Sequence, residues 1–344
     1  MRLSSPARQR WQRFTANRRA FWSLWIFVAL FFITLFAEGI ANDRPLLVRY
    51  AGSWYAPVLV NYTEKDFGGE FETFANFRDP YLAEKIKTDG WMFWPPIRYS
   101  YDTINYDLQV PAPAPPSADN LLGTDDQGRD VLARAIYGFR LSVLFGLTLT
   151  LLASVIGICA GALQGYFGGT LDLLMQRLIE IWSGMPLLYM LIIMSSLIQP
   201  AFWPLLLLLL FFKWMALVGP VRAEFLRARN FDYVRAARAL GATDFSIMLR
   251  HILPNALVST LSYMPFIISG AINILATLDF IGLGLPPGSP SLGELLNQGK
   301  NNLQAPWLGF TAFVTLATLL SLLVFIFEGV RDAFDSRQNT RRGR

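Results

Sequence analysis

Apolar and polar stretches alternate along the chain, and the apolar stretches are longer than an ordinary soluble core accommodates. Each comes close to the roughly 20 residues that a helix needs to cross a hydrocarbon layer about 30 Å thick. Because backbone N–H and C=O groups inside a bilayer must be paired within their own segment, such stretches cross it as helices. The pattern predicts an all-α integral membrane protein with six transmembrane helices, at residues 21–36, 141–163, 173–198, 202–218, 257–278 and 310–327.

The composition supports a membrane protein and argues against several kinds of site. Hydrophobic residues make up 53% of the chain and charged residues 16%, against about 45–50% and about 25% in soluble domains. The only cysteine is Cys159 and the only histidine is His251. An intrachain disulfide is therefore excluded, and a His/Cys metal site or a histidine-based triad is not expected. We expect no catalytic, metal or cofactor site on this chain.

The net charge of +5 does not indicate a nucleic-acid partner, because the basic residues lie at the chain ends and in loops between apolar stretches. That distribution is typical of a cytoplasmic membrane face. With the amino terminus inside, segments 166–172 and 222–254 and the basic tail 333–344 also lie inside. Segments 199–200 and 281–306 then lie outside. We therefore expect a multi-pass protein with both termini in the cytoplasm.

Residues 1–41 combine a basic leader with the first apolar stretch, and two interpretations compete. The stretch is either an uncleaved first helix or a signal peptide cleaved near the small residues at 39–41. The apolar run is long for a signal peptide, and Glu38 stands just ahead of the small residues. Both features favour the uncleaved helix.

Residues 42–135 are polar and lack a membrane-length apolar run, which predicts an extracytoplasmic insertion between the first and second helices. Residues 43–134 hold 14 acidic and 9 basic side chains. Short β-like stretches at 45–50 and 55–62 alternate with turn residues, and the proline-rich segment 111–116 is typical of a stiff linker. We expect a small folded unit, largely β or irregular.

Small residues on the second predicted helix indicate close packing. Gly157, Ala160, Gly161 and Gly165 lie three or four positions apart, so they share a helix face on which a second backbone can approach closely. The alternative is a scatter of small residues over a lipid-facing surface.

Charged residues and helix breakers inside the spans are candidates for a pathway or gate. Glu180 and Lys213 are costly in a bilayer unless they face protein or water. They line a pathway, form a stabilising pair, or extend their charged ends to the inner interface. Gly184 and Pro186 predict a kink in the third span, which serves as a gate or improves packing.

The loop 222–254 predicts two short helices around a tight turn. Asp232 is a candidate N-cap, and Gly241 accepts the left-handed conformation that ends a helix. Thr243 or Asp244 then caps a second helix that Pro254 ends. The apolar positions of that helix are Phe245, Met248, Leu249 and Ile252. Such an element fits a groove on a partner protein or, alternatively, lies on anionic lipid through its arginines.

This loop resembles the EAA loop of ABC importer permeases, in which Glu-Ala-Ala is followed by a glycine and an Ile-x-Leu-Pro-like ending. The matching residues are Ala236, Ala237, Gly241, Ile252, Leu253 and Pro254, and Arg235 stands at the glutamate position. Four further segments resemble dipeptide and oligopeptide permeases, at 121–130, 282–286, 290–296 and 305–307. The amino-terminal third resembles the Yej-type peptide importers, at 41–50, 52–55 and 66–69.

The resemblance implies a MetI-like permease core at residues 136–332 and transport of oligopeptides across the bacterial inner membrane. Peptide-nucleotide antibiotics such as microcin C are implied as further substrates. The implied partners are a second homologous permease in a heterodimer, a cytoplasmic ABC ATPase, a periplasmic peptide-binding protein and membrane lipid. The residues implied to couple this chain to the ATPase are Asp232, Arg235, Ala236, Ala237, Leu240, Gly241, Ala242, Ile252 and Pro254.

The resemblance also implies that ATP and magnesium are bound by the ATPase. The glycine-containing stretch 293–300 has the wrong spacing for a phosphate-binding loop, and Asn301 follows it where Ser or Thr is required. The chain is therefore expected to be a transport subunit and not an enzyme.

Two other functions stay open. A permease for a non-peptide solute, such as a nickel chelate, would share all the core motifs. A membrane sensor or enzyme would have to act through the insertion, which has carboxylates but no histidine, cysteine or glycine-rich phosphate loop.

Overall fold

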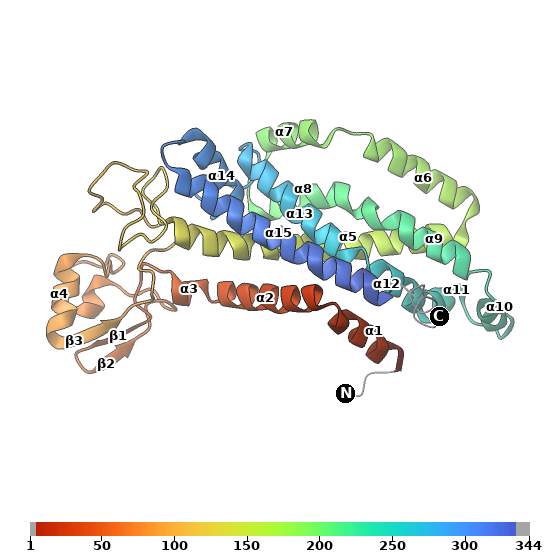
Figure 1. The fold of residues 1–344 in the computed structure, drawn as a ribbon, viewed down its shortest axis with the longest axis horizontal. Coiled ribbons are helices and arrows are strands. Elements are labelled where there is room, and N and C mark those ends of the chain that lie inside the picture. The colour runs from red at the N-terminus through yellow and green to blue at the C-terminus, as the bar shows by residue number, and fades with distance from the viewer. Residues whose placement is uncertain (1–4, 335–344) are drawn as a thin grey trace.

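A computed structural model describes residues 5–334 as an elongated helical body with a small β-containing unit at one end (Figure 1). The longest helix, α5, extends along much of the body beside α15. The α-helices are α1 (Ser5–Ala16), α2 (Arg18–Leu35), α3 (Ala37–Ile40), α4 (Pro80–Asp89), α5 (Val131–Phe167), α6 (Gly169–Ser183), α7 (Leu187–Leu197), α8 (Phe202–Lys213), α9 (Val218–Ala228), α10 (Asp232–Ala239), α11 (Asp244–Ser246), α12 (Leu253–Leu261), α13 (Met264–Phe280), α14 (Leu292–Asn301) and α15 (Pro306–Phe334). The other elements are strands β1 (Leu47–Tyr50), β2 (Ser53–Tyr55) and β3 (Gly90–Phe93), 3₁₀ turns η1 (Glu64–Phe67) and η2 (Trp214–Leu217), and the π-helical segment η3 (Ile247–Ile252).

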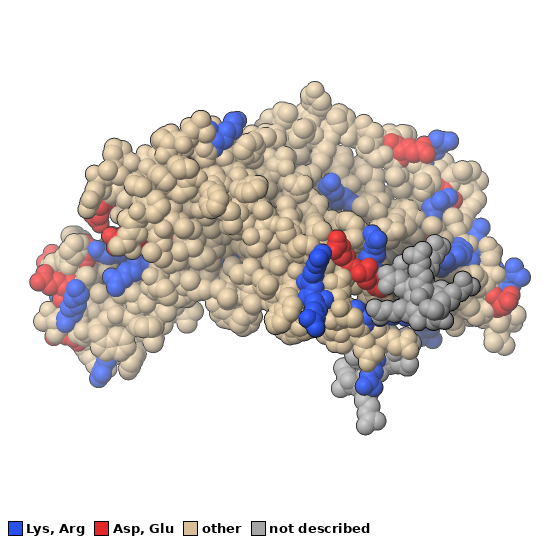
Figure 2. Space-filling model, in the orientation of Figure 1, with Lys and Arg blue, Asp and Glu red and all other residues tan. Residues whose placement is uncertain are grey.

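Four helical stretches in the described chain are long and apolar enough to cross a membrane: Arg18–Leu35, Val131–Phe167, Phe202–Ala228 and Pro306–Phe334. The pair α6 and α7 makes a fifth if it is counted as one bent span. Charged side chains on the face shown in Figure 2 gather toward the two ends of the body, and the wide middle is almost free of them. This is the surface expected of a protein whose middle lies in lipid.

Two of the six predicted spans are interrupted in the structure. The predicted span 173–198 is divided into α6 and α7, which are bent by 71° at the break. The break contains Gly184 and Pro186, so the predicted kink is confirmed. The predicted span 257–278 is divided between α12 and α13, and α13 alone has 17 residues. Pro265 lies in the first turn of α13, where a proline leaves no N–H unpaired.

The close packing predicted from small residues is confirmed between α5 and the continuous segment of η2 and α9. A Cβ added at Gly157, Gly161 or Gly165 would lie 2.5, 2.7 or 2.5 Å from the carbonyl oxygen of Trp214, Val218 or Arg222, respectively. Both sets of residues repeat every four positions. The two helices therefore approach backbone to backbone along the same register, which only glycine permits.

The insertion folds as an antiparallel sheet with strand order β2-β1-β3, covered on one face by α4 and η1. Its core consists of Val48, Phe67, Phe77, Leu82 and Ile86. The first predicted strand coincides with β1, but the stretch 55–62 is wrong as a strand, because β2 ends at Tyr55 and a turn follows.

The insertion and the helical body are joined by polar contacts around α3. The Tyr137 hydroxyl donates to the Ala41 carbonyl at 2.9 Å, and Arg140 forms two 2.8 Å bonds with the Glu38 carboxylate. The Arg140 guanidinium lowers the pKa of the Glu38 carboxyl. Because α5 begins at Val131, the last residues of the predicted insertion 42–135 belong to this helix. The predicted outer loop 281–306 likewise contains a helix, α14.

Candidate functional site

The predicted turn of the 222–254 loop lies at the end of the body opposite the sheet (Figure 1). Helix α10 ends in two backbone bonds, from Gly241 N–H to the Arg238 carbonyl and from Ala242 N–H to the Ala237 carbonyl, at 3.0 and 3.1 Å. Gly241 has φ +83° and nothing lies within 4 Å of an added Cβ. This is the Schellman arrangement, so the glycine is required by its backbone conformation and not by lack of space.

The start of α10 differs from the prediction. Phe231, and not Asp232, occupies the N-cap position, and no side chain bonds the first turn. Asp232 is the first helical residue, where its negative charge favours the positive helix N-terminus.

The second helix begins as predicted and continues further. The Thr243 hydroxyl accepts a bond from the Ser246 N–H and caps α11. Pro254 does not end the helix, because it lies in the first turn of α12. The preceding segment η3 is π-helical, and the Leu253 N–H bonds the Met248 carbonyl five residues back. The wider π turn lets the chain pass a proline that an α-helix interior would not tolerate.

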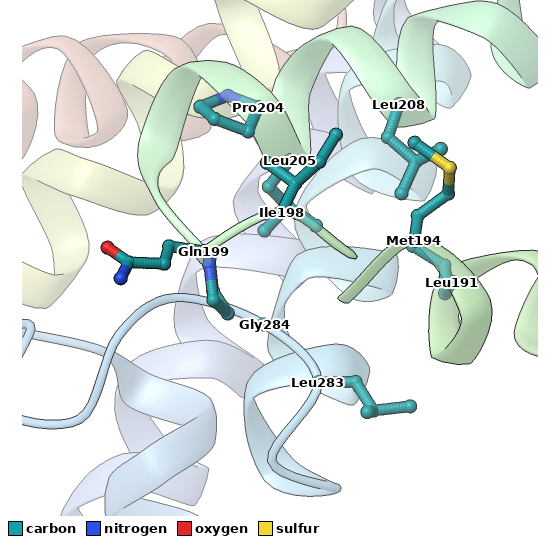
Figure 3. A pocket seen from close by; sticks show the side chains of 10 residues that line it. Leu191, Met194, Ile198, Gln199, Pro204, Leu205, Leu208, Leu283 and Gly284 are labelled. Carbon is teal, nitrogen blue, oxygen red and sulfur yellow. The ribbon is translucent and has the colours of Figure 1, made fainter. Parts of the chain in front are cut away.

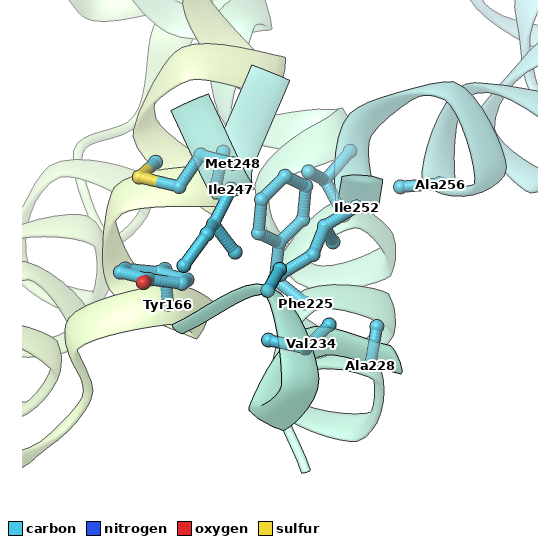
Figure 4. Close-up of a cluster of buried hydrophobic side chains, with 11 residues drawn as sticks. Tyr166, Phe225, Ala228, Val234, Ile247, Met248, Ile252 and Ala256 are labelled. Atoms are coloured by element: carbon cyan, nitrogen blue, oxygen red, sulfur yellow. The ribbon is translucent and has the colours of Figure 1, made fainter. Parts of the chain in front are cut away.

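One buried apolar cluster attaches this loop to the helical body. Val234 and Ala237 of α10 and Ile247, Met248 and Ile252 of η3 contact the end of α5 and α9. Figure 4 shows the side chains of Val234, Ile247 and Ile252 gathered around Phe225, with Tyr166 beside Ile247 and Met248. Of the four apolar positions predicted for the second helix, Met248 and Ile252 are buried, whereas Phe245 and Leu249 are exposed.

Polar bonds tie the same loop to the end of α5. The Tyr166 hydroxyl donates to the Asp244 carboxylate and accepts a 3.0 Å bond from Arg238. Arg229 bonds the carbonyls of Gly165 and Tyr166 at 3.4 and 3.3 Å. Displacement of α10 or α11 would therefore move the end of the longest helix.

A second anchor holds the turn between α5 and α6. Arg222 on α9 bonds both carboxylate oxygens of Asp172 on α6, at 2.5 and 2.6 Å. The planar guanidinium fixes the direction as well as the distance of this pair. Helices α5, α6 and α9 thus meet at one place directly beside the 222–254 loop.

The outward side of the loop carries large apolar side chains. Leu240 is 88% exposed and Phe245 is 72% exposed. Arg235 and Arg238 are exposed beside them. The loop therefore has a buried face fixed to the membrane helices and an apolar face without a covering element in the described chain, which is the arrangement of a docking surface.

The predicted pathway residues are not brought together. Glu180 pairs with Arg177 of its own helix at 2.6 Å, and both side chains are exposed. Pro186 precedes α7, and Lys213 is the last residue of α8. A small pocket of about 40 Å³ lies between the ends of α7 and α8 and the 283–284 turn (Figure 3). Its lining includes none of these three residues.

The structure also assembles a buried ion cluster that sequence reasoning missed. Arg129 and Arg134 both contact Asp125 and Glu294, with N–O distances from 2.7 to 3.4 Å. Trp307 adds a 3.1 Å bond from its indole N–H to the Thr124 carbonyl. Segments 121–130, 290–296 and 305–307, which resemble those of peptide permeases, therefore form one contact region next to the insertion. The charged and aromatic residues of these segments were the sequence signal from which the ion cluster could have been predicted.

Comparison with known proteins places the chain among transport proteins. Residues 134–340 match the family described as "Binding-protein-dependent transport system inner membrane component", and residues 5–67 match "N-terminal TM domain of oligopeptide transport permease C". The inner membrane ABC transporter permease protein YejE of Escherichia coli is 61% identical over 97% of this chain and 98% of its own. The peptidoglycan transport system permease protein YejE of Agrobacterium fabrum is 54% identical over 98% and 95%.

A more distant relative and a solved structure each cover about three fifths of this chain. The dipeptide transport system permease protein DppC of Haemophilus influenzae is 37% identical over 63% of this chain and 74% of its own. Among solved structures, the inward-facing MetNI methionine ABC transporter aligns over 59% of this chain with 19% identity and a TM-score of 0.49.

Proposed function

Because the chain belongs to the family of binding-protein-dependent transport system inner membrane components, we propose that it carries short peptides through the bacterial inner membrane as one permease subunit of an ABC importer. The peptide substrate is supported by relatives over nearly the full chain and by the dipeptide permease. Members of this family are transport components, so ATP hydrolysis belongs to a separate subunit.

The observation that carries the proposal is the two-faced loop around Gly241. Its exposed side, with Leu240 and Phe245, would press into a groove of the ATPase, and Arg235 would stand at the rim of this contact. Its buried side is fixed to α5 and α9. Closure of the ATPase would thus be transmitted to the spans and shift the chain between inward-open and outward-open states.

The arrangement also supports the remaining partners. Helices α6 and α7 expose apolar side chains along most of their length, with Asp172 and Leu191 the buried exceptions in the described chain. This side would meet the second permease, and α6–α7 and α12–α13 would each complete a broken span of a six-span, MetI-like core. The sheet end would face the periplasm and the peptide-binding protein, with the α10 end in the cytoplasm. The tail 333–344, predicted to be cytoplasmic, lies almost entirely outside the described residues.

Replacing Gly241 with valine is expected to lower peptide uptake by about tenfold or more. The left-handed backbone costs a non-glycine residue about 1–2 kcal/mol, and most for a β-branched one, so the Schellman turn that positions Leu240 would distort. Uptake of a radiolabelled tripeptide by cells with the whole importer measures this, together with the amount of chain in the membrane. Gly241→Asn is the matched control, since asparagine accepts this conformation, and it should retain most uptake. Wild-type uptake by the valine variant would refute the coupling role.

The proposed orientation predicts which side of the membrane Leu240 faces. In a Cys159→Ala background, Leu240→Cys should react with a membrane-impermeant maleimide in inside-out vesicles and not in spheroplasts. Leu59→Cys, in the insertion, should show the opposite pattern, because Leu59 is also highly exposed. Labelling of Leu240→Cys in spheroplasts alone would contradict the proposed topology.

A further inference from the structure

A second pocket, of about 480 Å³, lies in the insertion and is separate from the loop around Gly241. It is bounded by α4, by the segment that follows β3, and by residues of the linker leading to α5. Pockets of this size accommodate small organic molecules.

Three cations line this pocket, Arg78, Lys87 and Arg98. Within the described residues, none of the three forms an ion pair. Because no acidic side chain is paired with them, these guanidinium and ammonium groups are available to an anionic ligand.

Two of the cations are held in place by aromatic rings. The Arg78 guanidinium lies 4.1 Å from the centre of the buried Tyr99 ring, and the Arg98 guanidinium lies 5.6 Å from the Trp94 ring. A guanidinium stacked on a ring keeps its N–H donors free at the edge, where they bind a carboxylate in bidentate fashion. The stacking thus prepares the pocket for a planar oxyanion.

The linker contributes the opposite charge. Asp107 and Asp119 line the same pocket, and neither forms an ion pair in the described chain. Met92 and Trp94 add apolar surface to the same pocket. A matching ligand has a carboxylate at one end, an ammonium group at the other and apolar groups between them.

We infer that this pocket binds a short peptide with free termini, its carboxylate at Arg78 and Arg98 and its ammonium group at Asp107 and Asp119. The site lies in the insertion, and its occupancy can be measured without transport. It is therefore independent of the coupling role of the Gly241 loop.

The pocket is connected to the helical body through buried amides. Asn105 lines the pocket and donates a 2.9 Å bond to the Asn120 side chain, which donates a 2.8 Å bond to the Asp130 carboxylate. Asp130 caps α5 by accepting a 2.7 Å bond from the Ala133 N–H. A ligand that fixes Asn105 would stabilise the start of the longest helix, so binding should raise the melting temperature of the whole chain.

The test is titration of the purified full chain in lipid nanodiscs with Ala-Ala-Ala, followed by tryptophan fluorescence and melting temperature. Ala-Ala-Ala should bind, its C-terminal amide should bind at least about tenfold more weakly, and its N-acetyl form should also bind more weakly. Arg78→Gln should weaken binding of the free peptide by a similar factor and leave the weak binding of the amide unchanged. That second result reports loss of a carboxylate contact and not general damage.

Arg49→Gln is the matched control. Arg49 also stacks on an aromatic ring, Trp54, at 5.8 Å, but it does not line the pocket. This variant should bind the peptide as the unaltered chain does. Three outcomes would overturn the inference. They are equal binding of the peptide and its amide, equal loss of binding in the Arg78→Gln and Arg49→Gln variants, and no binding of Ala-Ala-Ala at millimolar concentration. Binding of inorganic phosphate in preference to the peptide would also overturn it.

Discussion

Replacing Arg134 with methionine is expected to destabilise the chain by about 3–5 kcal/mol, the range for breaking a buried ion pair by removing one partner. Arg134 is fully buried, lies 3.4 Å from Asp125 and 3.1 Å from Glu294, and donates to the Ser289 carbonyl at 2.9 Å. Methionine matches its length but leaves the carboxylates with one cation instead of two. Thermal unfolding of the purified chain in detergent measures the loss as a lower melting temperature.

Arg140→Met is the control for this variant. Arg140 lies on the same helix and pairs with Glu38 at 2.8 Å, but the two side chains are 21% and 47% exposed. Pairs in contact with water contribute at most about 1 kcal/mol, so the melting temperature should fall only slightly. Similar losses in the two variants would show that burial of the Arg134 cluster has no special importance for stability.

The close packing of α5 against another helix was predictable because its signal is local. Small residues four apart on an apolar helix favour close helix packing, and Gly157, Gly161 and Gly165 show that spacing directly. Which helix they contact was not predictable, since the partner positions Trp214, Val218 and Arg222 are not small. A glycine face accepts any backbone, so it does not encode the identity of its neighbour.

The backbone breaks were harder to predict than the apolar stretches that contain them. Hydropathy is an average over the side chains of a stretch. It does not indicate the residue at which backbone hydrogen bonding along the helix is interrupted. Pro186 revealed one break, but its 71° angle depends on tertiary packing. The π turn before Pro254 depends on a change in backbone pairing over six residues, which composition does not indicate.

The insertion was predicted least well because its strands are short and pair over long sequence distances. Strand β1 pairs with β3 about forty residues later, and each has four residues. Period-two patterns cannot be recognised in so few positions. The start of α4 did have a local signal, because Asp79 followed by Pro80 is typical of a helix N-terminus, and the Asp79 carboxylate does accept a bond from the Tyr81 N–H.

The ion cluster shows the same limit of local reasoning for charges. The segment containing Asp125 and Arg129 was recognisable as a motif, but Glu294 lies 165 positions after Arg129. Neither segment contains a pattern that predicts its charged residues will pair with those of the other segment. Only the fold explains why these charges are buried without being unpaired.

Replacing Gly165 with valine is expected to destabilise the contact between α5 and α9 by about 3 kcal/mol, at the upper end of the usual cost of overpacking. A Cβ there would lie 2.5 Å from the Arg222 carbonyl oxygen and 2.5 Å from the Phe225 Cβ. Because backbone atoms cannot rotate away, α9 must shift. That shift would weaken the bonds from Arg229 to the Gly165 and Tyr166 carbonyls, so peptide uptake should be lost together with part of the thermal stability.

Gly219→Val separates this packing effect from the general effect of valine in a helix. Gly219 lies on α9, and nothing lies within 4 Å of an added Cβ. Glycine and valine differ little in helix propensity, so stability should change by no more than about 0.5 kcal/mol, and uptake should stay close to that of the unaltered chain. If Gly165→Val melts and transports like Gly219→Val, then the close approach at Gly165 does not connect the 222–254 loop to the spans.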